Sequence, residues 1–201
     1  MGTVITAPTV GRPRDAEATT AILDAMLHLL AERGYAQAST AAVAARARAS
    51  KATIYRRWPS KHALVADAIR HGLRAPPAAP ATGDPRADLV AIMEGVITAL
   101  THTPLGGAIR SVISEAAHAP ELSAALQAVT TEAREAGPVR PLLLAARDQG
   151  LLAADADIDL LLDLILGAPY FQLIVRQVPP RPQQARALVD QLLKPAPERQ
   201  P

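Results

Sequence analysis

Apolar residues recur at helical spacing along most of this chain. Ile22, Met26 and Leu30 form an i, i+4 stripe that predicts a helix over residues 15–33. A similar stripe predicts another helix over residues 61–73. No segment alternates apolar and polar positions as a half-buried strand does, and Ala, Leu and Arg, which favour helix, are abundant. The sequence therefore predicts an all-α fold.

Between these two helices, residues 39–64 predict two short helices joined by a tight turn. Ser39 or Thr40 can cap the first helix, and Ser50 can cap the second, which covers residues 51–57. The segment carries six Lys and Arg residues and no Asp or Glu. Such an arrangement is typical of a helix-turn-helix, whose second helix enters the major groove of DNA. We therefore predict a DNA-binding module.

The second half of the chain predicts a helical bundle divided by prolines and glycines. The expected helices are Arg86–Thr101, Leu105–Ala117, Glu121–Ala136, Val139–Gln149, Asp157–Val175 and Gln183–Leu193. Residues 158–166 leave almost no polar side over two turns, so this helix has to be buried on two sides, one of which a partner subunit can cover. We predict a two-fold dimer through the helices at 139–149 and 157–175. Its predicted interface residues are Leu143, Arg147, Leu160, Leu161, Leu164 and Ile165.

Proline content and charge divide the chain into a basic and an acidic part. The predicted segments are a disordered arm (1–14), a three-helix DNA-binding domain (15–75), a Pro-rich linker (76–85), an effector-binding and dimerisation domain (86–194) and a disordered tail (195–201). Residues 1–75 hold eleven Lys and Arg against five Asp and Glu, whereas residues 76–201 hold ten against fourteen. This asymmetry indicates a DNA-facing module on a mildly acidic body.

Composition excludes several other classes of protein. The chain has no Cys, which excludes disulfides and fits the reducing cytoplasm, and it shows no signal-peptide pattern. The most apolar stretch, residues 158–175, contains Asp and Pro, so we expect no membrane span. The five His residues show no metal-ligand spacing, and Asp155, Asp157 and Asp159 lack the Gly and Glu of a calcium loop. No catalytic or nucleotide-binding motif is present, so we expect no enzyme activity, metal or cofactor.

The run from Ser50 to Leu64, SKATIYRRWPSKHAL, resembles the recognition-helix signature of TetR-type transcriptional repressors, and the resemblance covers residues 15–75. The typical pattern is Ser-x-Gly-Thr-Leu-Tyr-x-His-Phe-x-Ser-Lys-x-x-Leu. Two positions depart from the family: Arg48 stands in the turn and Ala52 stands ahead of the Thr, where Gly is frequent. Arg48 implies a turn made without positive φ, or one made with strain.

The resemblance assigns roles within the motif. Lys51, Ala52 and Thr53 are expected to face bases, Tyr55 to meet the DNA backbone, and Trp58 to pack inward. The predicted DNA-binding residues are Thr40, Arg48, Ser50, Lys51, Ala52, Thr53, Tyr55, Arg56, Arg57 and Lys61. Of these, Tyr55, Arg56, Arg57 and Lys61 are expected to contact phosphates. The N-terminal arm is either a solvated tail or a further phosphate contact.

The resemblance also implies a dimer through the last two long helices and a small-molecule pocket in the C-terminal domain. We expect a mainly aliphatic pocket whose predicted ligand-binding residues are Ile97, His102, Ile109, Arg110, Ile113, Leu126, Tyr170 and Phe171. The predicted function is a cytoplasmic homodimeric repressor that binds a palindromic operator and is released by a small hydrophobic ligand through the helix at 61–73. The alternatives are a dimeric regulator without a ligand, or an enzyme carrying a helix-turn-helix module.

Overall fold

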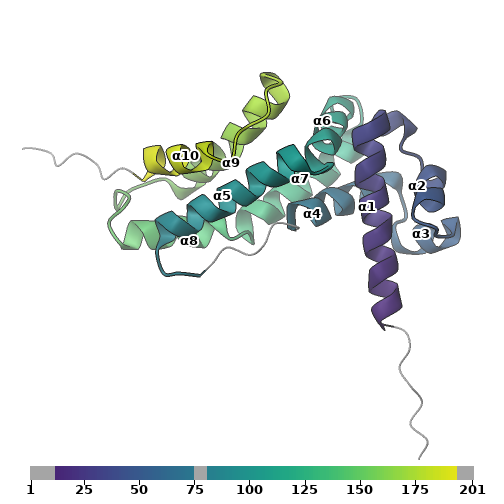
Figure 1. Cartoon of the computed structure of the whole chain (residues 1–201), viewed down its shortest axis with the longest axis horizontal. Helices are drawn as coiled ribbons and strands as arrows, with labels where there is room; N and C mark the ends of the chain where they lie inside the picture. The colour runs from purple at the N-terminus through teal and green to yellow at the C-terminus, as the bar shows by residue number, and fades with distance from the viewer. Residues whose placement is uncertain (1–11, 75–80, 194–201) are drawn as a thin grey trace, which may run out of the picture.

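The computed structural model describes residues 12–74 and 81–193, and these residues form helices joined by short connections (Figure 1). The all-α fold class is thus confirmed. The helices are α1 (Arg12–Gln37), α2 (Thr40–Arg46), α3 (Lys51–Arg57), α4 (Lys61–Arg74), α5 (Pro85–His102), α6 (Leu105–Ala116), α7 (Pro120–Glu135), α8 (Val139–Asp148), α9 (Ile158–Tyr170), a π-helical segment η1 (Phe171–Val175) and α10 (Gln184–Leu192). Residues 1–11 of the predicted arm, the predicted tail and part of the linker lie outside the described residues, while residues 12–14 of that arm belong to α1.

Helices α1 to α4 form the half of the molecule that is predicted to bind DNA, called the DNA-binding half below, and they lie at one end (Figure 1). The stripe of Ile22, Met26 and Leu30 is fully buried, as its spacing predicts. Helix α1 begins three residues before its predicted start, and Gly34, with φ of 79°, interrupts it where the sequence predicts its end. Trp58 is also buried, which confirms its inward-facing role.

Helices α5 to α10 form the second half, and the predicted bounds of the six helices agree with the structure to within one residue when the π-helix η1 is counted with α9. The last long helix differs from its prediction in geometry. Pro169 lies inside α9 and cannot donate a backbone hydrogen bond, and beyond Tyr170 the chain widens into the π-helix η1. The widening rotates the side chains that follow, so a continuous α-helical pattern over residues 157–175 misplaces them.

The two halves share a continuous hydrophobic core. Gly72 of α4 lies so close to α6 that a Cβ there would be 2.7 Å from Leu105 Cδ1, so the helix through which release is expected packs directly on the C-terminal half. A second connection was not predicted: α1 packs along α6, where a Cβ on Gly107 would be 2.9 Å from Ala31 Cβ. Movement of α6 would therefore reach the DNA-binding half through both α1 and α4.

Candidate nucleic-acid interface and effector cavity

Serine caps hold the helix-turn-helix in place. Ser39 Oγ accepts a hydrogen bond from the backbone N–H of Ala42 at 3.2 Å, and Ser50 Oγ accepts one from the N–H of Thr53 at 3.0 Å. In the turn between α2 and α3, Arg48 has φ of 51°, a left-handed conformation that costs a non-glycine residue about 1–2 kcal/mol. The sequence left open whether this turn avoids positive φ or is strained, and the structure has the strained turn.

The exposed face of α3 carries the residues expected to meet DNA. Lys51, Ala52, Tyr55 and Arg56 are exposed, while Ile54 on the opposite face is buried in the domain core. The spacing i, i+1, i+4 and i+5 places the four exposed side chains on one side of the helix. The chain has no Asp or Glu between Glu32 and Asp67, so every side chain that α3 presents on this side is neutral or positively charged.

Polar neighbours already engage three of the predicted DNA contacts. Lys61 Nζ donates to the backbone carbonyl of Tyr35 at 2.5 Å and lies 3.8 Å from the centre of its ring, and burial lowers the pKa of Lys61. Arg57 folds back to pair with Asp15 at the start of α1. The hydroxyl of Thr53 lies 2.9 Å from that of Ser50. Lys61 and Arg57 are thus tied to their own domain, and Arg48, Lys51 and Arg56 are the better candidates for phosphate contacts.

Adjacent arginines on α3 provide a direct test of this arrangement. We expect Arg56→Ala to reduce the salt slope of binding to non-specific duplex DNA by about one unit, because it removes one phosphate contact. Arg57→Ala should leave that slope unchanged and lower the melting temperature slightly, because it removes only the pair with Asp15. Fluorescence anisotropy across a KCl series measures the slopes. Equal slopes for the two variants would contradict the orientation of α3.

One side of α9 is an exposed apolar surface. The exposed fractions of Leu160 and Leu164 are 55% and 49%, whereas Ile165 on the same helix is fully buried. Leu143 of α8 is also fully buried, so Leu143 and Ile165 contact only their own chain and are withdrawn as interface residues. By length and composition alone, residues 158–175 are apolar enough to cross a membrane, and only 28% of this segment is buried. An exposed apolar surface of this kind is typical of a site that another molecule buries.

A cavity of about 710 Å³ lies between the DNA-binding half and the C-terminal helices. Helices α4, α5, α6, α7 and α9 contribute to its walls, and Ile109, Ile113, Leu126 and Tyr170 from the predicted ligand-binding set line it. Burial raises the pKa of Tyr170 to about 12, so its phenol stays protonated at neutral pH. The volume is within the range of about 300–1,000 Å³ that is typical of small-molecule sites.

The other predicted ligand-binding residues lie elsewhere. Ile97 is buried in the core formed by α5, α8, α9 and α10, and His102 and Arg110 are exposed residues outside the cavity lining. Phe171 is 55% exposed: its backbone N–H still donates to the carbonyl of Gly167, so it lies one helical step of about 100° beyond Tyr170, which lines the cavity. These four positions are corrected, since none of them faces the cavity.

Sequence reasoning missed the charged residues of the cavity wall. Arg70 Nε donates to Glu132 Oε2 at 2.6 Å, and Arg74 pairs with the other oxygen of the same carboxylate. Arg134 pairs with Asp163 farther along the wall. The i, i+4 spacing of Arg70 and Arg74 on α4 places them on one face, but their partner in α7 is about sixty residues away in the sequence.

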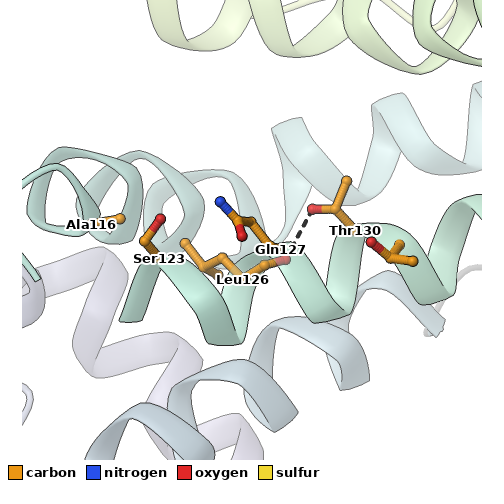
Figure 2. A pocket seen from close by; sticks show the side chains of 6 residues that line it. Ala116, Ser123, Leu126, Gln127 and Thr130 are labelled. Carbon is orange, nitrogen blue, oxygen red and sulfur yellow. Dashed lines mark hydrogen bonds between the residues drawn. The ribbon is translucent and has the colours of Figure 1, made fainter. Parts of the chain in front are cut away.

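A second, smaller hollow of about 280 Å³ lies beside α7 (Figure 2). It is lined by Ala116, Ser123, Leu126, Gln127, Thr130 and Thr131. The hydroxyl of Thr130 donates to the carbonyl of Leu126 at 3.0 Å, so it is used within the helix (Figure 2). The hollow has no charged lining residue, and the larger cavity is the better candidate for a ligand site.

Known proteins resemble the chain over nearly its whole length. The family model "Bacterial regulatory proteins, tetR family" matches residues 22–68, and "Tetracyclin repressor-like, C-terminal domain" matches residues 79–192. An uncharacterized HTH-type transcriptional regulator of Mycobacterium tuberculosis, Rv1556, is 37% identical over 191 residues, which cover 95% of this chain and 91% of the relative. YdeS of Bacillus subtilis, also an uncharacterized HTH-type regulator, is 30% identical over 82% of each chain. The crystal structure of the TetR family transcription regulator SCO0332 superposes with a TM-score of 0.71 at 33% identity, covering 88% of this chain and 97% of that one.

Proposed function

The chain belongs to the TetR family of DNA-binding transcriptional regulators, and on this premise we propose that it is a homodimeric repressor that a small, mainly hydrophobic ligand releases from its operator. The family is one of regulators and not of enzymes, so the proposal concerns binding alone. The observation that carries it is the cavity of about 710 Å³ that α4 shares with the C-terminal helices. A ligand there would contact the helix that follows the recognition helix.

The DNA-binding part of the proposal rests on the exposed basic face of α3 and on the apolar surface of α9. A two-fold dimer that covers Leu160, Leu161 and Leu164 would pack α8 and α9 against their symmetry mates as a four-helix contact. It would present two recognition helices to a palindromic operator, whose half-sites are one helical turn, about 34–36 Å, apart. We place the protein in the cytoplasm, where this DNA is, and expect no membrane partner.

The open cavity favours an effector over the alternative of a regulator without a ligand. A domain that served only dimerisation would gain stability by filling this space, since empty apolar volume loses packing energy. Its walls instead combine apolar side chains with the polar groups of Arg70, Arg74 and Glu132, as ligand sites do. A ligand that moves α6 or α7 against α4 would change the spacing of the two recognition helices.

Thermodynamic reciprocity provides the test of this function. Fragments of genomic DNA selected by the protein would supply the operator, and a thermal-shift screen of hydrophobic compounds would supply ligands. We expect each true effector to bind more weakly in the presence of operator, by the same factor by which it weakens operator binding. Calorimetry with and without operator measures that factor. A ligand that fills the cavity but binds equally well in both titrations would contradict release by this site.

A further inference from the structure

Two guanidinium groups share one carboxylate at the wall that α4 gives to the cavity. Arg70, Arg74 and Glu132 all line the cavity, and each oxygen of Glu132 accepts from one of the two arginines. The hydrogen bond from Arg70, together with the positive charges of both arginines, lowers the pKa of Glu132, so this carboxylate is ionised at neutral pH. Among the lining residues, two guanidinium groups thus share one carboxylate, and the other side of Arg70 pairs with Asp67, which lies outside the lining.

The other charged part of the wall has a single lining arginine. Arg134 pairs with Asp163, which also lines the cavity, and lies 3.5 Å from Asp159. Asp159 in turn pairs with Arg140, so this group contains two acids and two arginines. The wall at α4 therefore presents an anion with two adjacent guanidinium groups, whereas the other part presents one that already lies between two carboxylates.

The remaining lining residues are predominantly apolar. Those from α4, α6, α7, α9 and the π-helix are Ile69, Leu73, Ile109, Val112, Ile113, Leu126, Val129, Leu166 and Ile174. A ligand that fits both surfaces has an apolar body and one acidic group. Because the group that it would replace on the arginines is the carboxylate of Glu132, a carboxylate matches their geometry.

We propose that the effector is an apolar carboxylic acid whose carboxylate displaces Glu132 from Arg70 and Arg74. The inference rests on the proposed function of the cavity as an effector site. Displacement would break the ion pairs that join α4 to α7 and would leave the arginines charge-compensated by the ligand. The acidic group would thus determine both affinity and the release of α7 from α4.

Arg70 also connects this site to the recognition helix. The other side of its guanidinium pairs with Asp67 Oδ1, and Asp67 Oδ2 accepts a hydrogen bond of 2.8 Å from Trp58 Nε1. Trp58 is the residue that ends α3. A change in the position of Arg70 therefore reaches the end of the recognition helix through two hydrogen bonds. The path lies within one half of the molecule and does not require the linker.

Three probes with the same alkyl chain test the choice of ligand class: decanoate, 1-decanol and decylamine, each titrated calorimetrically into the full chain. We expect decanoate to bind about tenfold more tightly than decanol, because its carboxylate gains charge-assisted hydrogen bonds, and decylamine to bind most weakly. Equal binding of decanoate and decanol would overturn this inference but leave a hydrophobic effector site in place. Binding of none of the three would overturn both.

Variants of the charged residues locate the carboxylate. Arg74 is largely exposed, so Arg74→Gln should fold normally, lose most of the preference for decanoate and keep its affinity for decanol. Glu132→Gln should bind decanoate several-fold more tightly, because the competing carboxylate is gone. Arg134→Gln, on the other side of the cavity, is the matched control and should keep the preference. A preference lost in Arg134→Gln and retained in Arg74→Gln would overturn the assignment.

Two further variants test the connection to α3. Asp67→Asn keeps the shape of the side chain, and Trp58→Phe removes only the donor to Asp67 together with part of the ring. Trp58→Phe should bind decanoate within about twofold of wild type, and Asp67→Asn at least as tightly, because Arg70 loses a competing carboxylate. Decanoate should nevertheless release at least several-fold less DNA from each variant. If decanoate released as much DNA from both variants as from wild type, the proposed path would be overturned. Thermal melting checks that each variant is folded.

Discussion

A double variant, Leu160→Asp with Leu164→Asp, is expected to be a folded monomer that has lost nearly all affinity for a palindromic operator. Both side chains are about half exposed in the single chain, so aspartates there need not enter the core. In a dimer, however, they would place carboxylates without partners in an apolar interface. Loss of the second recognition helix should then lower operator affinity by about a hundredfold or more, since bivalent binding depends on the link between the two halves.

Light scattering and operator binding, measured on the same preparations, check this result. Ala128→Asp on the exposed side of α7 is the matched control, and it should remain a dimer with wild-type affinity. Leu162→Asp should instead unfold the protein. Leu162 lies on the same helix as Leu160 and Leu164, but its side chain is buried in the core. A double variant that remained dimeric would show that the partner covers another surface.

The local part of this structure could be predicted from the sequence because its determinants are close together in the chain. The serine that caps α3 and the hydrophobic spacing of α1 each act within a few residues, and both appear where they were predicted. Asp157 is the first residue of the helix predicted over 157–175, and in the structure it caps α9 with two hydrogen bonds. The bounds of the C-terminal helices followed from prolines and glycines in the same way.

Side-chain partners could not be predicted, because they depend on residues far away in the sequence. Arg57 looked like a phosphate ligand, but the fold brings Asp15 to it from 42 residues away. Leu143 and Ile165 were assigned to the interface from an all-apolar pattern that does not show which side faces the core. The π-helix after Tyr170 had no clear sequence signal beyond Pro169, and Phe171 lies outside the expected cavity because neighbouring residues of a helix face different directions and Tyr170 is the one that lines it.

The corner between α5 and α6 leads to a second large effect: Gly106→Ala should destabilise the protein strongly. The two helices meet at an angle of 76°, and Thr103 supports the corner by donating to the carbonyl of Ala99 at 2.6 Å. A Cβ on Gly106 would lie 2.0 Å from the backbone carbonyl oxygen of Leu100, which cannot rotate away as a flexible side chain could. We expect a loss of about 3 kcal/mol in the free energy of unfolding.

Gly150→Ala separates this steric cost from the cost of backbone conformation. Gly150 has φ of 73°, and within the described part of the chain no atom lies within 4 Å of an added Cβ, so its substitution should cost only the conformational strain of about 1–2 kcal/mol. Thermal unfolding at equal protein concentration compares the two, and Gly106→Ala should melt at the lower temperature. Because α6 packs on α1 and α4, Gly106→Ala should also weaken DNA binding below its melting transition, whereas Gly150→Ala should not. Equal stability of the two variants would show that the corner can open, and that α6 is not held rigidly against the DNA-binding half.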